Sequence, residues 1–225
     1  MGELMPPSTY LLGLDLGQSQ DSTALIAASV TENAAADHEY DVGHIERVGL
    51  GTRYPEVVKH VCDVVDYLRR PYHVPGMPKG IEKRADVYLI IDYTGVGRPV
   101  ADMFLDAKPN CNLTLITITG GGAVTADPTG GWRVPKRDLA SSVQVVLQDM
   151  RVRWAKGLPL VPELKRELTG FRVKINARGH DSYGAGEDWR SAPHDDLVLA
   201  LAMLVWYGET RLVRGPLAWF VGDDE

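Results

Sequence analysis

Two continuous apolar runs, DVYLIID at residues 86–92 and NLTLITIT at residues 112–119, constrain the fold most strongly. Neither run alternates apolar and polar residues, and this pattern predicts strands that are buried on both faces. The segment between them, GRPVADMFLDAK, predicts a helix. A β-α-β alternation of this kind is typical of a sheet covered by helices on both faces.

The first part of the chain predicts a different arrangement. Residues 10–17, 23–31 and 39–50 are strand-like, and the polar turns between them predict an antiparallel meander. Residues 54–70 place four valines and one leucine at helical spacing, which predicts an amphipathic helix. The fold class predicted is therefore α/β, with a central mixed sheet of three antiparallel strands followed by parallel strands, flanked by helices.

The second half of the chain predicts more helix than strand. A glycine-rich loop, GGGAVTADPTGGW, precedes a helix over residues 136–150, and VPELKRELTGF predicts a shorter one. FRVKINARGHDSYGAG predicts a β-hairpin with its turn near residues 177–179. Residues 192–209 are apolar almost all round and predict a buried helix that begins near Pro193. Without a repeat or a long linker, we expect one domain over residues 1–225, with its core at about 10–209.

Composition excludes several classes of protein. Hydrophobic residues make up 44% of the chain and charged residues 24%, which is ordinary for a soluble globular protein. No apolar run reaches the roughly 18 residues of a membrane span, and the N-terminus lacks the pattern of a signal peptide. The two cysteines, Cys62 and Cys111, belong to no CxxC pair, and the six histidines form no HExxH motif. We therefore expect no membrane partner, no disulfide scaffold and a reducing cytoplasm.

Charge is distributed unevenly along the chain. The net charge is -6, which by itself argues against a nucleic-acid partner. Residues 130–180, however, hold eleven Lys and Arg against four Asp and Glu, a net charge of +7. This asymmetry favours a basic surface beside an acidic remainder, although clustering by chance explains it equally well.

Acidic residues occur at three points where strands or helices are expected to begin or end. Asp15 lies inside the first predicted strand, Asp92 ends the strand at 86–92, and Asp195 and Asp196 open the last helix. An aspartate after a strand often starts a turn, and acidic residues in a first helical turn often complement the helix dipole. Asp15 is harder to explain in this way, because a buried carboxylate is costly unless it is paired or bound to a metal.

Together these carboxylates predict a metal site. If the first and fourth strands are neighbours, Asp15 and Asp92 face one crevice, and the start of the last helix lies beside it. Carboxylates that close cannot all ionise without cations between them. Hard oxygen ligands select Mg²⁺ or Mn²⁺, and a pair of such ions cleaves phosphodiesters.

The sequence also resembles a known family. GLDLGQSQDSTALI, LIIDYTGVGRPVADMF, WRVPKRDLASSVQVVLQDMRV, LVPELKRELTGFRVKI and HDDLVLALAMLVW, spread over about residues 10–207, resemble segments of the RNase H-like superfamily. More narrowly, they resemble the nuclease domain of the large terminase subunit of tailed phages. The IDYTGVGRPV and HDDLVLALA segments are the most specific, whereas DLG alone is common.

The resemblance implies an activity and a set of roles. It implies an endonuclease in the host cytoplasm that cuts concatemeric double-stranded DNA during genome packaging, using two divalent cations, Mg²⁺ or Mn²⁺. Its partners would be the terminase ATPase domain, the small terminase subunit and the portal. It implies catalytic roles for Asp15, Asp92 and Asp196 and metal ligation by these residues and Asp195. His194 is an accessory candidate that would bind a metal or contact phosphate.

The choice between the last two aspartates depends on helix geometry and on the resemblance. Adjacent helical residues point about 100° apart, so Asp195 and Asp196 are not expected to ligate one ion equally. The resemblance favours Asp196, because the family's ligand tends to come immediately before the apolar helical run. Asp195 would then be a second ligand, a water-mediated contact or a helix-start residue.

One departure from the family leaves alternatives open. The chain has no GxxxxGK[ST] phosphate loop, so no ATPase domain is expected, and the chain is either an isolated nuclease domain or a stand-alone relative. The first glycine segment and ITITGGGA also resemble loops of actin-like ATPases and kinases, although those need two such domains. A Holliday-junction resolvase shares the fold and the acidic residues. A binding module with an inactive fold is the non-enzyme alternative, against which the intact acidic residues count.

Basic and aromatic residues fit a DNA partner. Arg133, Lys136 and Arg137 follow the glycine-rich loop, and the last two open a helix, where positive charge opposes the dipole. Lys174 and Arg178, with Arg172, lie on the predicted hairpin, which would follow the DNA backbone. A solvated face explains these charges equally well. Trp132 and Trp189 would stack on bases or, more simply, pack in the core.

Overall fold

An eight-stranded mixed sheet forms the centre of the molecule, in the order β10-β3-β2-β1-β6-β7-β9-β8. The computed structural model describes residues 7–17, 22–74, 76–78, 80–94, 97–128, 130–171 and 195–212. The strands of the sheet are β1 Thr9–Asp15, β2 Thr23–Glu32, β3 His38–Val48, β6 Asp86–Asp92, β7 Asn112–Thr119, β8 Thr125–Ala126, β9 Trp132–Pro135 and β10 Val152–Trp154. A separate two-stranded ribbon joins β4 Tyr72–His73 to β5 Glu82–Lys83.

Strand direction changes at β1. On one side β2 pairs with β1, and β3 with β2, in antiparallel register. On the other side β6, β7 and β9 follow in parallel register. At the edges, β8 is antiparallel to β9 and β10 is parallel to β3. The predicted fold class, an α/β mixed sheet with three antiparallel strands and then parallel strands, is confirmed.

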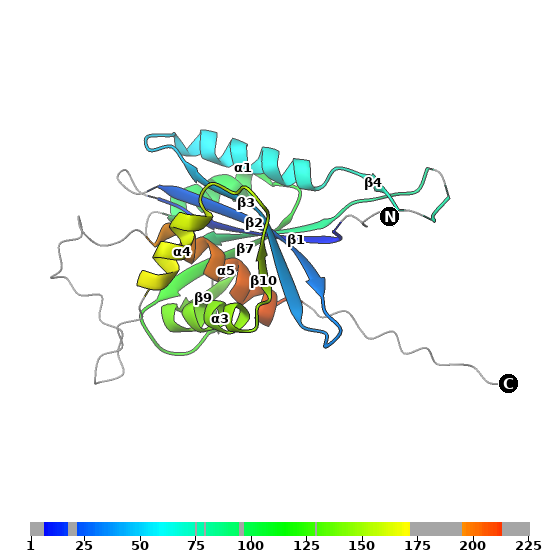
Figure 1. Cartoon of the computed structure of the whole chain (residues 1–225). Helices are drawn as coiled ribbons and strands as arrows, with labels where there is room; N and C mark the ends of the chain where they lie inside the picture. Colours follow the sequence, from blue (N-terminus) through cyan, green and yellow to red (C-terminus); the bar gives the residue numbers. More distant parts are fainter. Residues whose placement is uncertain are drawn as a thin grey trace.

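Helices cover both faces of the sheet. Figure 1 shows α1 on one side and α3, α4 and α5 on the other. The helices are α1 Tyr54–Leu68, α2 Gly97–Ala107, α3 Lys136–Gln148, α4 Val161–Gly170 and α5 Asp196–Thr210. Two separate clusters of buried side chains result, one under α1 and α2 and the other around α5 with α3 and α4. The apolar runs of β6 and β7 contribute side chains to both clusters, as expected for strands covered on both faces.

Helix α5 is the central helix of its layer. It is buried along nearly its whole length, from Leu197 to Trp206. The helix lies so close to β1 that a Cβ at Gly13 would overlap the backbone carbonyl of Ala200. Glycine at this position therefore allows the close approach of helix and strand.

Some sequence predictions differ from the structure. Asp15 is the last residue of β1 rather than an interior one, because the chain leaves the sheet at Leu16 and Gly17. The strands β4, β5, β8, β9 and β10 were not predicted, because two to four residues are too few to show a period. The predicted hairpin after Phe171 and the region around Pro193 lie outside the described residues. Within the described residues, no helix is long and apolar enough to cross a membrane.

Candidate active site

The carboxyl ends of β1 and β6 form the centre of the candidate site. The two strands are parallel neighbours, and Leu14 pairs with Ile91. Asp15 and Asp92 are the next residue on each strand, so their side chains project to the same face. That face carries α5, because the residues two positions earlier, Gly13 and Ile90, pack against it. The sheet thus brings two acidic residues, 77 positions apart in the chain, to one edge.

Burial perturbs both carboxyl groups, and the charges of neighbouring carboxylates add to its effect on Asp15. Burial raises the pKa of Asp15 well above its usual value, and the charges of Asp92, Asp195 and Asp196 raise it further, while Lys136 opposes the shift. Burial also raises the pKa of Asp92, against opposing hydrogen bonds from Thr94 and with Asp15. The Thr94 amide donates to Asp92 Oδ1 at 2.8 Å. A hydrogen bond between two carboxyl groups requires a shared proton, so without a cation the pair is not fully ionised.

The start of α5 adds two more carboxylates to this edge. Asp195 occupies the N-cap position, but its side chain does not cap the helix. Instead, Lys136 Nζ lies 2.7 Å from its Oδ2, and the two side chains are 25% and 43% exposed. Asp196 is buried and accepts from both sides of the Arg47 guanidinium, from Nε at 2.8 Å and from Nη2 at 2.9 Å. Each aspartate therefore has its own basic partner.

The donor chemistry fits a hard divalent cation, although the aspartates do not yet form a closed ligand set. Carboxylate oxygens are the expected ligands for Mg²⁺ or Mn²⁺. In the part of the chain that the structure describes, no three His, Cys, Asp or Glu side chains converge closely enough to hold a metal ion. Lys136 and Arg47 hold the α5 carboxylates as internal counterions. Ligation by Asp195 or Asp196 therefore requires that a contact to its basic partner loosen.

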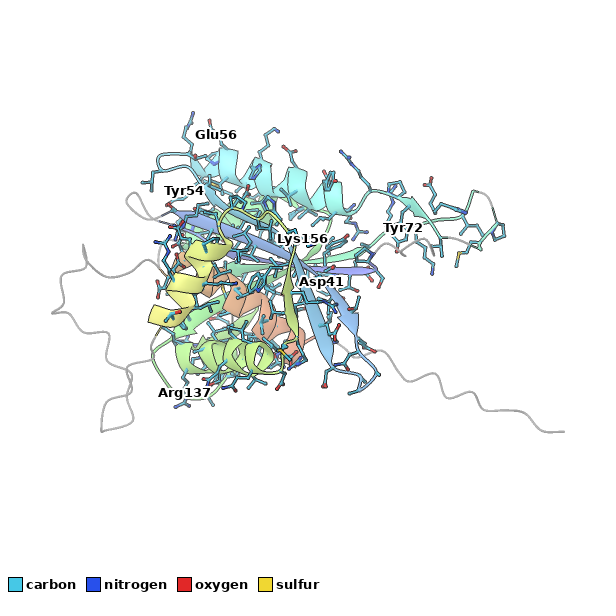
Figure 2. All side chains as sticks on the ribbon, in the orientation of Figure 1. Asp41, Tyr54, Glu56, Tyr72, Arg137 and Lys156 are labelled. Carbon is cyan, nitrogen blue, oxygen red and sulfur yellow. The ribbon has the colours of Figure 1, made fainter. Side chains whose placement is uncertain are left out.

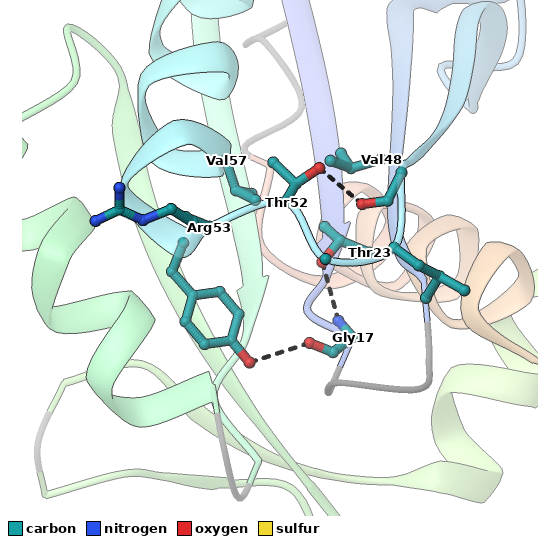
Figure 3. Close-up of a pocket in the computed structure, with 10 residues that line it drawn as sticks. Gly17, Thr23, Val48, Thr52, Arg53 and Val57 are labelled. Atoms are coloured by element: carbon teal, nitrogen blue, oxygen red, sulfur yellow. Dashed lines mark hydrogen bonds between the residues drawn. The ribbon is translucent and has the colours of Figure 1, made fainter.

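A second set of contacts fixes the chain where it leaves β1. Figure 3 shows Gly17, two residues beyond Asp15, between two hydrogen bonds. The Gly17 amide donates to Thr23 Oγ1 at 3.1 Å, and the Tyr54 hydroxyl donates to the Gly17 carbonyl at 3.3 Å. Gly17 lines one end of a cleft of about 230 Å³ that continues to Val57 on α1. These contacts hold the end of β1, and with it Asp15, in a defined position.

The predicted DNA-binding residues fall into three groups. Arg133 is exposed on β9, and Arg137 lies at the surface of α3 (Figure 2), where it donates to the Gly122 carbonyl at 2.6 Å. Lys136 lies inside the acidic site instead, and its Nζ also lies 5.0 Å from the centre of the Phe171 ring. Three further predicted site residues lie outside the described residues, namely Lys174, Arg178 and His194.

Trp132 packs rather than stands free. Its ring lies 6.5 Å from that of Trp206, and the Arg211 guanidinium lies over it at 3.4 Å. This contact favours the core role that the sequence left open beside base stacking. Trp189 lies outside the described residues.

Three residues of the site were not predicted from the sequence. Arg47 near the end of β3 contacts Asp196, and it also contacts Glu163 and Glu167 on α4. The only available signals were a lone arginine in a predicted strand and two glutamates at helical spacing, and both patterns are common on protein surfaces. Their meeting depends on how α4 and α5 lie over the sheet, which no local pattern encodes.

Comparison with known proteins places the fold. No protein-family model and no curated protein matches the sequence. The crystal structure of the large terminase nuclease from thermophilic phage G20c superposes with a TM-score of 0.52 at 19% identity, covering 89% of this chain and 82% of that one. The Mn-bound large terminase nuclease domain of bacteriophage SPP1 gives 0.46 at 11% identity, over 87% and 84% of the two chains. Thermus thermophilus RuvC gives 0.40 at 11% identity, over 92% and 99%.

The first of these superpositions covers most of both chains. The superposed part of this chain includes most of its mixed sheet and helices, since 89% of the chain is covered. The chain therefore has the RNase H-like fold of the G20c large terminase nuclease.

Proposed function

We propose that the chain is a metal-dependent endonuclease that cleaves double-stranded DNA with little sequence specificity. The observation that carries the proposal is that Asp15 and Asp92 end adjacent parallel strands, with Asp195 and Asp196 near enough for their charges to raise the pKa of Asp15. The mutual repulsion of these groups supports a site that a divalent cation completes. The fold, shared with a large terminase nuclease, is compatible with this activity.

The proposed ligands come from three elements. Asp15 and Asp92 would present carboxylates from adjacent strand ends, which are rigid supports, and the first turn of α5 would supply the third group. Two Mg²⁺ or Mn²⁺ ions bound there would activate a water molecule and stabilise the leaving oxygen of the phosphodiester. Lys136 would exchange its contact with Asp195 for a DNA phosphate oxygen as the carboxylate turns. Arg133 and Arg137 would contact the phosphate backbone farther along the DNA strand.

The biological setting is proposed from the sequence resemblance. It favours cleavage during viral genome packaging in the host cytoplasm, with a terminase ATPase domain, a small terminase subunit and a portal as partners. An isolated nuclease domain would bind DNA weakly, since the motor that holds the substrate would be a separate domain. Adding a candidate ATPase subunit should then raise the rate of cleavage on linear DNA.

Nicking of supercoiled plasmid by the purified chain tests the proposal. We expect relaxation of the plasmid with Mn²⁺ or Mg²⁺, none with EDTA, and none with the double variant Asp15→Asn/Asp92→Asn. Unchanged activity in EDTA would exclude the metal mechanism. Cleavage confined to four-way junctions would favour a resolvase, and ATP hydrolysis without nicking would favour the actin-like alternative.

A further inference from the structure

Arg47 lies in the same row of the sheet as Asp15. Asp15 of β1 pairs with Ala24 of β2, and Ala24 pairs with Arg47 of β3. Residues directly opposite each other project to the same face, so the Arg47 side chain lies on the face that carries α5. With two strand spacings between them, the backbones of Arg47 and Asp15 are about 10 Å apart. Arg47 is thus next to the candidate site but belongs to a strand that supplies no carboxylate to it.

The Arg47 guanidinium joins two helices to the sheet. Its Nε and Nη2 atoms contact the two oxygens of Asp196 at the start of α5. Its Nη1 lies 2.7 Å from Glu163 Oε1, and its Nη2 also contacts Glu167, both on α4. The side chains of Arg47, Asp196 and Glu167 are only 19%, 9% and 7% exposed. Three carboxylates therefore share one guanidinium, which offsets part of their mutual repulsion.

A second arginine anchors the other end of the same helix. Arg151 donates through Nη1 and Nη2 to the two oxygens of Glu209, at 2.8 and 3.0 Å, and through Nη1 to the His38 carbonyl. Glu209 lies thirteen residues beyond Asp196, which is about 20 Å along a helix. The two arginines make the same kind of forked contact, but only Arg47 does so beside the acidic residues.

We infer that Arg47 is a positioning residue of the site: by holding Asp196, it fixes the first turn of α5 at the edge that carries Asp15 and Asp92. This inference rests on the proposed function. An arginine suits the task because its planar fork holds both carboxylate oxygens and keeps its charge at every physiological pH. The ion pair of Asp195 with Lys136 is partly exposed, so this carboxylate can turn while its neighbour stays fixed.

Mn²⁺ binding by the full chain tests this role without reference to cleavage. Isothermal titration with Mn²⁺ alone would be compared for the wild type, Arg47→Ala, Arg47→Lys and Arg151→Ala, with the melting temperature of each measured in EDTA. We expect both alanine variants to melt lower than the wild type. Only Arg47→Ala should weaken Mn²⁺ binding, by about tenfold or more, as for other groups that orient metal ligands. Arg151→Ala should bind within about twofold of the wild type.

The lysine variant keeps the test decisive if Arg47→Ala does not fold. Lysine retains the charge but not the forked shape of the guanidinium. The Mn²⁺ affinity of Arg47→Lys should therefore lie between those of the wild type and Arg47→Ala. Wild-type affinity in a folded Arg47→Lys or Arg47→Ala variant would overturn the positioning role and leave the proposed function intact. Equal weakening in Arg47→Ala and Arg151→Ala would assign both to general support of α5 and would also overturn it. A wild type that binds no Mn²⁺ would instead overturn the proposed function.

Discussion

Asp15 is a buried carboxyl group whose ionised form is disfavoured at the candidate site when no cation is present. Burial and the charge of Asp92 raise its pKa in the folded state, so the folded chain holds a proton more tightly than the unfolded chain does. The free energy of unfolding then falls as the pH rises above the pKa of aspartate in the unfolded chain, about 3.9. The loss is complete above the pKa of Asp15 in the folded chain. The ionised carboxyl therefore destabilises the metal-free protein at neutral pH.

Replacing this carboxyl should relieve the cost. In EDTA, Asp15→Asn should melt at the same temperature as the wild type or higher at about pH 8, with a smaller difference at about pH 5, and it should not nick DNA. Thermal unfolding followed by circular dichroism at both pH values measures this. A large fall in melting temperature would mean instead that Asp15 is a structural hydrogen-bond acceptor.

Asp195 and Asp196 differ in how firmly they are held. The sequence resemblance favoured Asp196 as the main ligand, a choice that remains untested. The contacts favour Asp195 as the group that can turn to a cation, because its ion pair with Lys136 is partly exposed and exposed pairs contribute only about 0–1 kcal/mol. Asp196 is held on both oxygens by Arg47.

The two asparagine variants should therefore differ. We expect Asp195→Asn to abolish measurable Mn²⁺ binding and Asp196→Asn to weaken it to the extent that Arg47→Ala does. Anomalous diffraction from crystals soaked in Mn²⁺ would show the ligands directly, at about 2.0–2.2 Å for a small hard ion. Peaks beside Asp196, with Asp195 turned away, would return the main role to Asp196.

Arg133 and Arg137 are the predicted DNA contacts that the described part of the chain exposes outside the acidic site. If both hold phosphates, Arg133→Ala/Arg137→Ala should flatten the dependence of log K on log salt by roughly one unit per lost contact. Fluorescence anisotropy with a DNA duplex measures the slope. Lys59→Ala, on α1, is the control and should leave the slope unchanged. An unchanged slope in the arginine variant would assign both residues to a solvated face. The same measurement on Lys174→Ala/Arg178→Ala tests the predicted hairpin.

At the scale of the element, the packing of α5 against β1 places the acidic residues. Gly13→Ala would put a Cβ into the Ala200 carbonyl, which is backbone and cannot rotate away. Overpacking of this kind typically costs about 1–3 kcal/mol, and a backbone clash falls at the upper end or beyond. Urea unfolding should show this loss of stability, and titration with Mn²⁺ should show weaker binding.

Gly43→Ala on β3, where a Cβ would meet nothing within 4 Å, is the control and should retain wild-type Mn²⁺ binding. Wild-type stability in Gly13→Ala would show that helix and strand are not in close contact.

How far each element could be predicted depended on its length and pattern. The bounds of β6 and β7 were predicted to the residue, because a continuous apolar run between polar ends marks a buried strand clearly. The strand β9 has only four residues and follows a glycine-rich loop, so no period distinguishes it. Asp92 was predicted at a strand end, as observed. Asp15 was predicted inside a strand, although β1 ends at this residue. Apolar Leu16 after it extended the apparent strand by two residues.

The contacts of Arg47 lie beyond what local patterns can show. They join β3 to α4 and α5, which lie more than a hundred residues later in the chain, and depend on the angle at which the helices cross the sheet. Carboxylate positions, by contrast, followed from strand order alone once β1 and β6 were taken as neighbours. Sequence reasoning thus identified the acidic residues but not the side chains that hold them.

Over the whole molecule, the basic stretch is not one free surface. Of its eleven Lys and Arg residues, Lys136, Arg151 and Arg153 are paired with carboxylates outside the stretch, on α5 and β3. These pairs tie the layers together rather than attract DNA. The exposed remainder that the structure describes is Arg133, Arg137, Lys156, Lys165 and Arg166. These five exposed residues come from β9, α3, α4 and the loop after β10, and few free charges of this kind fit an enzyme that binds DNA weakly by itself.

The central claim is that the aspartates at the ends of β1 and β6 and at the start of α5 bind divalent cations and thereby cut DNA. Plasmid nicking by the wild type and by Asp15→Asn/Asp92→Asn, across a range of Mn²⁺ concentrations, tests it most directly. The account predicts nicking by the wild type that rises and saturates with Mn²⁺, disappears in EDTA, and is absent from the double variant at every concentration. Nicking by a folded double variant at the wild-type rate, or by the wild type in EDTA, would contradict it.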